Sequence, residues 1–100
     1  MFAQVVQGGT TLEKRPEMDK IVNEMLMPAL KEEPGFAGGL NLVDRQSGAG
    51  MMIMLWETED QAKVPASERG SGFLKALAEI ASISSGNRAP ITTWEVNARV

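Results

Sequence analysis

The chain of 100 residues contains no cysteine, no histidine and no tyrosine. Without cysteine there are no disulfides and no thiolate nucleophile, and without either cysteine or histidine there is no zinc site built on those ligands. The lack of histidine also removes imidazole bases and the proximal histidine ligand of haem. Acid–base chemistry is therefore left to Asp, Glu, Lys and Arg, to the chain termini, or to the substrate itself.

Basic clusters and long apolar segments are also missing. Ten Lys and Arg face 13 Asp and Glu, for a net charge of −3, and the basic residues are scattered along the chain. Because nucleic-acid binding relies on a basic face, we expect no nucleic-acid partner. The longest apolar run, residues 51–56, is far shorter than the roughly 20 residues of a membrane-spanning helix, and the N-terminal residues do not resemble a signal peptide. We therefore expect a cytoplasmic protein without a membrane partner.

The remaining composition is that of a folded protein. Apolar residues make up 43% of the chain, and neither an internal repeat nor a linker interrupts it, so residues 1–100 are expected to form a single domain. A domain of this size buries only about 60–70% of its unfolded surface, which leaves a small stability margin. A partner chain would be a natural source of further burial.

Hydrophobic periodicity predicts four strands and two helical regions. The strands are expected at residues 2–7, 36–44, 50–56 and 94–100. An amphipathic helix is expected over 16–32, bent at Pro28. Thr58 and Gln61 form a capping-box pair that begins a short helix, which is broken at 64–65 and 70–72 and resumes over 73–83, before a loop at 84–90. This order is the ferredoxin-like βαββαβ plan, an α+β fold with an antiparallel sheet and helices on one face.

The strand predicted at 50–56 indicates a homodimer. An antiparallel strand with one wet face alternates between apolar and polar residues, but residues 51–56 are apolar on both faces. Two helices cover only one side of the sheet, so the other side needs a second sheet, and a second copy of the chain is the simplest supplier. The alternative is that some of these side chains stay exposed, although a contiguous apolar patch on a small domain more often marks an interface.

Three groups of residues resemble a known family. They are Pro28-Ala29-Leu30 with Glu33-Pro34-Gly35-Phe36, then Leu42-Val43-Asp44-Arg45, then Leu55-Trp56-Glu57-Thr58. In these segments the chain resembles the antibiotic biosynthesis monooxygenase-like proteins, which are ferredoxin-like homodimers also called dimeric α/β barrels. The resemblance spans nearly the whole chain and implies their fold and their sheet-to-sheet dimer. It implies less about chemistry, because the superfamily contains oxygenases, haem-degrading enzymes and members without known activity.

The resemblance points to Trp56 as a site residue. The family's cofactor-free oxygenases carry a Trp near the ligand at this position, but their Asn four residues earlier is Met52 here, and their Tyr six residues later is Ala62. Haem is not expected, because the haem-degrading branch needs an axial His. A cofactor-free oxygenase needs only to bind, orient and dehydrate a substrate that itself supplies the electron to oxygen.

Five residues are candidates for ligand contact. Met52 and Met54 share a strand face with Trp56, so the three would line an apolar cavity or form plain core. Asn41 would orient a ligand if the strand register places it on that face, but a backbone or dimer contact would equally satisfy its amide. Gln7 points either into the same cavity or into solvent.

Two functions follow from these observations. The first is a cofactor-independent monooxygenase that acts on a small aromatic or quinol-type substrate in an apolar cavity, with no metal and no residue yet assigned to catalysis. The alternative is a non-catalytic ligand-binding or accessory dimeric domain. The absence of histidine and tyrosine and the replacement of the strand Asn favour this alternative.

Overall fold

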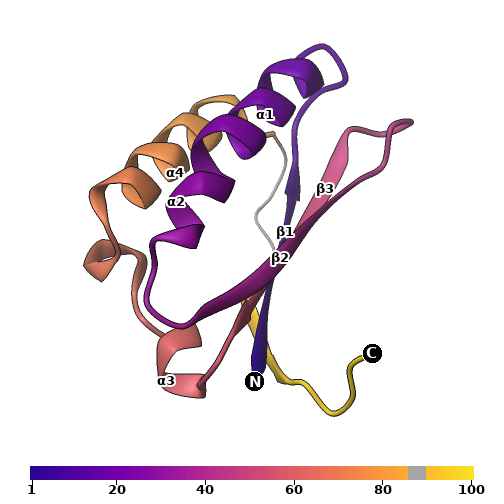
Figure 1. Ribbon diagram of the computed structural model, residues 1–100. Helices are drawn as coiled ribbons and strands as arrows, with labels where there is room; N and C mark the ends of the chain where they lie inside the picture. Colours follow the sequence, from indigo (N-terminus) through magenta and orange to yellow (C-terminus); the bar gives the residue numbers. More distant parts are fainter. Residues whose placement is uncertain (86–89) are drawn as a thin grey trace.

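The computed structural model describes residues 1–85 and 90–100, and it confirms the predicted α+β ferredoxin-like order (Figure 1). The sheet is antiparallel with the strand order β2-β3-β1-β4. Its strands are β1 Phe2–Gly9, β2 Phe36–Val43, β3 Ala49–Trp56 and β4 Thr92–Glu95. The helical segments are α1 Arg15–Ile21, η1 Val22–Leu26, α2 Met27–Lys31, α3 Glu59–Ala62, η2 Ala66–Glu68 and α4 Ser71–Ile83. Part of the loop predicted at 84–90 lies outside the described residues.

The helix predicted over 16–32 is a continuous helical stretch whose middle turn, η1, is π-helical. Pro28 has no N–H to donate to the preceding turn, and its ring crowds the carbonyl four residues before it. The wider turn lies directly ahead of the proline, where the N–H of Met27 donates to the carbonyl of Val22, five residues back. The irregularity predicted at Pro28 therefore takes the form of a π turn.

The short helix predicted from the capping box is also present. The Thr58 hydroxyl accepts from the Gln61 N–H at 3.2 Å, and the Gln61 side-chain oxygen accepts from the Thr58 N–H at 3.1 Å. These reciprocal bonds satisfy two of the N–H groups that the first turn of α3 leaves without helical partners. After η2, helix α4 begins at Ser71, two residues before the apolar stripe that predicted it.

The last strand is shorter than its alternating sequence predicts, and the expectation of a strand over 94–100 is wrong for this chain alone. Strand β4 pairs with β1 from Thr92 opposite Val5 to Glu95 opposite Phe2. The Val96 N–H still reaches the Met1 carbonyl at 2.9 Å. The ladder ends at that bond, and residues 96–100 keep the alternating pattern without the further pairing that would make them a strand.

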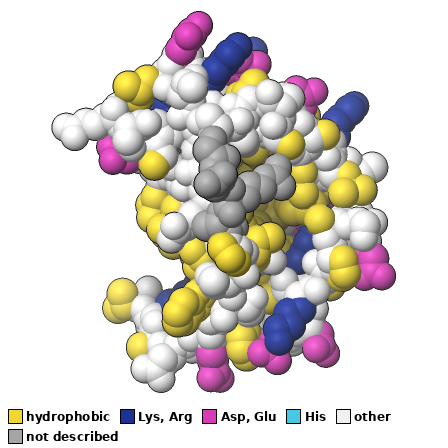
Figure 2. All heavy atoms as spheres, turned by 180° about the vertical axis from the view of Figure 1, so that it is seen from behind, with side chains coloured by type: hydrophobic (Ala, Val, Ile, Leu, Met, Phe, Trp, Pro, Cys, Tyr) yellow, Lys and Arg dark blue, Asp and Glu magenta, His cyan; other side chains and the backbone are white. Residues whose placement is uncertain are grey.

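The two faces of the sheet differ in their cover. Helices α1, α2 and α4 lie on one side of the sheet, whereas the other side carries no helix among the described residues (Figure 1). The helix-covered side holds the core, whose buried residues are Met18, Val22, Leu26, Leu30, Met52, Met54, Trp56, Ala62, Phe73 and Ala76. From behind, hydrophobic side chains gather around the middle of the molecule (Figure 2).

Strand β3 supplies apolar residues to both faces, as its sequence predicts. Residues directly opposite one another in a ladder share a face. Those of β3 that enter the core are Met52, Met54 and Trp56, and those on the uncovered face are Met51, Ile53 and Leu55. The neighbouring strands add exposed apolar side chains to the uncovered face, where Leu40 is 60%, Leu42 47% and Trp94 61% exposed. Among residues 1–85 and 90–100, no helix combines the length and apolar character needed to cross a bilayer.

Candidate functional site

The strand register places four of the five candidate residues on the helix-covered face. Asn41 lies opposite Met52, so it shares a face with Met52, Met54 and Trp56. Gln7 lies opposite Met51 on the other face and is exposed. Of the two positions considered for Gln7, the structure places it in solvent, apart from the other four.

Asn41 and Trp56 occupy different ends of the strand pair. Trp56 lies opposite Phe36 at the start of β2, whereas Asn41 lies five residues further along β2. The Asn41 side-chain amide donates to the Met51 carbonyl at 3.3 Å, which is the backbone contact considered as an alternative to a ligand. Asn41 also lines a cavity of about 390 Å³, together with residues of the helical stretch. Any site at Trp56 is therefore separate from the cavity at Asn41.

Trp56 is completely enclosed, with 0% of its surface exposed. The Phe36 ring stands edge-on to it, with ring centroids 5.5 Å apart and planes at 74°. The Arg69 guanidinium carbon lies 4.0 Å from the Trp56 ring centroid and 5.6 Å from the Phe73 centroid. The indole is thus held by one aromatic edge and one cation, contacts that each add to the stabilisation from burial.

The Trp56 indole N–H has no hydrogen-bond partner among the residues that the structure describes, although it is buried. Buried donors in proteins nearly always find an acceptor, and an unsatisfied one costs about 1–3 kcal/mol. Such a donor either reflects a core that tolerates the cost or is available to a bound group. This is the ambiguity that the sequence leaves open at Trp56.

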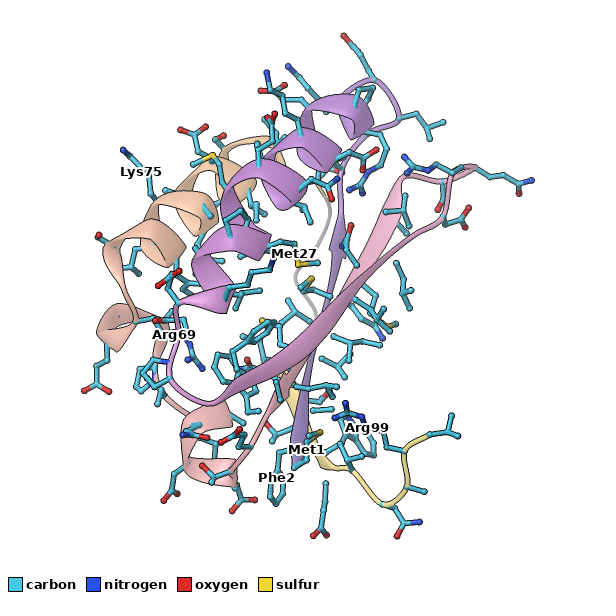
Figure 3. All side chains as sticks on the ribbon, viewed as in Figure 1. Met1, Phe2, Met27, Arg69, Lys75 and Arg99 are labelled. Carbon is cyan, nitrogen blue, oxygen red and sulfur yellow. The ribbon has the colours of Figure 1, made fainter. Side chains whose placement is uncertain are left out.

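Arg69 is the second unusual group in this region. It follows η2 in the loop ahead of α4 (Figure 3), and only 9% of its surface is exposed. Its Nη2 donates to the Gln61 carbonyl at 3.0 Å, and it makes no ion pair within the described part of the chain. Burial lowers the pKa of Arg69, and the negative charge of Glu33 opposes that shift. The group remains a cation at neutral pH, because the ordinary pKa of arginine lies far above neutrality.

Glu33 holds the loop that carries Arg69. Its carboxylate oxygens accept from the Gly70 N–H at 3.1 and 3.4 Å, directly ahead of α4. Gly70 is the N-cap of that helix and has no side chain to cap it. Glu33, which follows α2, supplies the capping carboxylate instead. The position of Arg69 over Trp56 is therefore fixed from both sides, by Glu33 through Gly70 and by Gln61 through its carbonyl.

No family model and no curated protein sequence matches the chain. Solved structures do match. SnoaB, a cofactor-independent oxygenase from Streptomyces nogalater, aligns with a TM-score of 0.73 at 15% identity over 99% of this chain and 96% of its own. A Nitrosomonas europaea protein assigned to the antibiotic biosynthesis monooxygenases aligns with a TM-score of 0.78 at 13% identity, over 98% and 100% of the two chains. A Bordetella bronchiseptica protein with the same assignment reaches 0.79 at 10% identity, over 97% of each.

The chain has the fold of the antibiotic biosynthesis monooxygenases. Identities of this size establish the architecture and leave the chemistry to the residues that this chain places within it. In this antibiotic biosynthesis monooxygenase fold, the end of β3 carries an aromatic ring whose N–H donor has no acceptor among the described residues, and a buried cation lies against that ring.

This pair of donors is suited to one kind of ligand. A guanidinium and an indole N–H both donate hydrogen bonds, and neither accepts one. Together they would favour an oxyanion attached to an aromatic ring, such as a phenolate or an enolate, since the apolar surroundings strengthen the charge interaction. Among the described residues, no three His, Cys, Asp or Glu side chains come together as a metal site.

Arg69 is not among the residues that the sequence pattern predicts for the site. An arginine between a short 3₁₀ turn and a glycine has the local context of a solvated loop residue, and nothing in the hydrophobic pattern marks it as buried. Its contact with Trp56 depends on how the loop folds back over the end of β3. The glycines at 70 and 72 were the nearest signal, because they mark an irregular chain path at this helix start.

Proposed function

We propose that this protein is a cofactor-independent monooxygenase that binds a small aromatic substrate in its phenolate or enolate form against Trp56 and Arg69. The observation that supports the proposal is the buried Arg69 guanidinium stacked on an indole whose N–H has no acceptor in the described residues. The oxygenase assignment of the structural neighbour SnoaB supports the reaction class.

The reaction needs no external reductant. A substrate with a methylene group beside a phenolic ring or a carbonyl binds as its resonance-stabilised anion, its proton having passed to bulk water. The anion passes an electron to O₂ and then combines with it as a peroxide, which takes a proton back from water. Loss of water leaves a carbonyl, so that CH₂ and O₂ give C=O and H₂O. Arg69 favours the anion by its charge, because an opposite charge nearby lowers the pKa of an acidic group. The protein otherwise orients the substrate and excludes water.

Ligand access requires a local movement. Trp56 is fully enclosed, so we infer that the segment between Trp56 and α4, which carries Arg69, opens to admit a substrate and closes again with Arg69 against it. That segment contains the four-residue helix α3 and the three-residue η2, and it is tied to the rest of the molecule through Gly70, which donates to Glu33. Short elements with few tertiary hydrogen bonds are the ones that open at low free-energy cost.

The proposed active form is a homodimer in which the uncovered sheet faces pack together. Apolar side chains on that face include Val5, Leu40, Leu42, Met51, Ile53, Leu55 and Trp94. A contiguous apolar face of this kind is uncommon on monomeric proteins and is covered in a two-fold dimer by its own copy. Covering the face would also stiffen β3, which carries Trp56.

Oxygen consumption tests the proposal. We expect uptake of one O₂ per substrate when tricyclic phenols with an activated methylene, or hydroquinones, are supplied without flavin, metal or reductant. With ¹⁸O₂, the methylene substrates should acquire one labelled oxygen atom in the product carbonyl. Saturable binding of these compounds with no oxygen uptake would contradict the proposal and favour the non-catalytic alternative.

That alternative, a ligand-binding or accessory dimer, has one specific observation in its favour. The cofactor-free oxygenases that the chain resembles carry an Asn where this chain has Met52 and a Tyr where it has Ala62. Both of these apolar residues are buried. A binding protein needs the donor pair of Trp56 and Arg69 but no further polar group. The oxygen-uptake experiment separates the two functions directly.

A further inference from the structure

A groove on the other end of the helix-covered side has the features of a second ligand site. It has a volume of about 390 Å³ and lies between the helical stretch and the edge strand β2. Its polar side chains are Asp19 and Asn23 from the helical stretch, Asn41 from β2, and Arg45 from the turn after β2. Asn41 is paired with Met52, well along β2 from the partner of Trp56, so the groove is distinct from the site described above.

The charges in and beside the groove favour an anion. The Asp19 carboxylate binds the Arg15 Nε at 3.0 Å and the Arg45 Nη1 at 2.6 Å. The hydrogen bond from Arg45 is the main cause that lowers the pKa of Asp19, and burial partly opposes it, so the carboxylate is ionised at neutral pH. Asp19 and Arg45 balance each other within the groove, and Arg15, which is buried and outside the lining, adds one positive charge beside it. Arg45 uses only Nη1 on Asp19 and is 68% exposed, so its remaining N–H groups can donate to an anion.

Two asparagine side chains are fixed with their oxygens available. The Asn23 Nδ2 donates to the Asp19 carbonyl at 2.8 Å, and the Asn41 Nδ2 donates to the Met51 carbonyl at 3.3 Å. A carbonyl can only accept, so the nitrogen end of each amide must face it. Within residues 1–85 and 90–100, neither Oδ1 receives a hydrogen bond from a protein donor. Both oxygens can therefore accept from a hydroxyl or N–H of a ligand.

The π turn contributes to the groove. Asn23 lies within η1, and Met27 follows it directly, so both reach the groove from one irregular part of the helical stretch. Figure 3 shows Met27 on the helical stretch, beside the sheet. Met27 supplies an apolar surface beside the polar groups. Single π turns inside helices often occur at functional sites, in addition to the accommodation of Pro28 that this one provides.

We propose that this groove binds a small hydroxylated organic anion, with its charged group at Arg45, its hydroxyl at the Asn23 and Asn41 oxygens, and its apolar part against Met27. The arginines alone have a structural explanation, because Arg15 also donates to the Gly48 carbonyl at 3.2 Å and thereby ties α1 to the β2–β3 turn. That explanation does not involve the two asparagine oxygens. The proposal does not depend on the reaction at Trp56.

The test is a nuclear magnetic resonance titration with 4-hydroxybenzoate, which carries a carboxylate, a hydroxyl and an apolar ring. We expect saturable shifts of the Asn23 and Asn41 side-chain amides and of the Arg45 Nε–H, with an affinity in the millimolar range, about that of a few hydrogen bonds and one exposed ion pair. Benzoate and phenol each lack one of the two polar groups, so each should bind about fivefold more weakly, the usual effect of one hydrogen bond.

Three variants show whether the asparagines carry the binding. Asn23→Ala and Asn41→Ala should each weaken 4-hydroxybenzoate about fivefold, and Asn41→Asp should abolish binding by placing a second carboxylate against the anion. Asn97→Ala is the matched control, because Asn97 is exposed and lies outside the groove. Unchanged affinity in the folded asparagine variants, or the absence of saturable shifts in the wild type, would overturn the proposal. Shifts confined to the Trp56 indole N–H would overturn it while supporting the separate site.

Discussion

The Arg69 guanidinium carbon lies 4.0 Å from the centroid of the Trp56 ring, and both side chains are buried. A buried cation without an ion-pair partner in the described residues is expensive, and the aromatic face offsets only part of that cost. The contact therefore contributes less to stability than its burial suggests. Retaining a cation here has a clear benefit if an anion binds beside it.

Replacing Arg69 with methionine separates stability from binding. Arg69→Met keeps most of the side-chain length and removes the buried charge, so we expect an unchanged or higher melting temperature. Binding of 4-nitrophenol should lose its preference for the phenolate over the neutral phenol, a preference expected to be about tenfold, or ~1.4 kcal/mol, in the wild type. Binding measured above and below the ligand pKa gives this ratio. The control Arg99→Met, in the exposed C-terminal residues, should leave the phenolate preference unchanged. A phenolate preference that survives Arg69→Met would contradict the role assigned to Arg69.

The proposed dimer predicts that Ile53→Asp is far more damaging than the same kind of change elsewhere. Ile53 lies at the middle of the uncovered sheet face, opposite Val5 and Leu40. A carboxylate buried there without a partner costs several kcal/mol, so light scattering at micromolar concentration should show a dimer for the wild type and a monomer or unfolded chain for Ile53→Asp. Leu74→Asp on α4, also apolar to acidic but 39% exposed and away from the sheet, should keep the dimer. A monomeric wild type would refute the sheet-to-sheet assembly.

The fold was predictable because its signals are local. Strand β3 is apolar on both faces and the helical stretch repeats at three and four residues, and both patterns report burial that each element experiences along its whole length. The end of β4 was not predictable in the same way. Residues 96–100 alternate like a strand, but a strand also requires a paired neighbour, and the ladder with β1 ends at the bond between Val96 and Met1.

The candidate site was only partly predictable, because its geometry depends on register and on loop paths. The face of Asn41 follows from the β2–β3 register, which is set by the turn around Gly48, where φ is +84°, and by the irregularity between Phe36 and Gly38. One residue of slip would have moved Asn41 to the opposite face. Arg69 lies 13 positions after Trp56, beyond two short helical elements, and no periodic pattern encodes their contact.

Asp19 should make the stability depend on pH at the acidic end. Its pKa is lowered in the folded protein, mainly by the hydrogen bond from Arg45. Its contribution is therefore fully present above the unfolded pKa of about 3.9 and is lost as the pH falls through the lower folded value. Because Asp19 is partly exposed, we expect about 1 kcal/mol or less. In urea titrations over a pH series, Asp19→Asn should lower the free energy of unfolding by that amount at pH 7 and make it fall less below pH ~4. The control Glu79→Gln on α4 should cause neither change. If the free energy of unfolding falls equally steeply with pH in the wild type and in Asp19→Asn, the linkage is disproved.

Trp56→Phe distinguishes a ligand-contacting indole from a core anchor. Phenylalanine keeps much of the apolar bulk and removes the N–H, which has no partner in the described residues, so the stability cost should come from lost volume and a weaker contact with Arg69, about 1–3 kcal/mol. If the N–H binds the substrate oxyanion, affinity for an aromatic anion should also fall about tenfold, or ~1.4 kcal/mol. Emission of Trp56 in a Trp94→Phe background should then respond to the ligand, since Trp94 is the other indole. A lower melting temperature with unchanged affinity and unchanged emission would place Trp56 in the core alone, because a contact between indole and ligand cannot leave both the affinity and the emission unaltered.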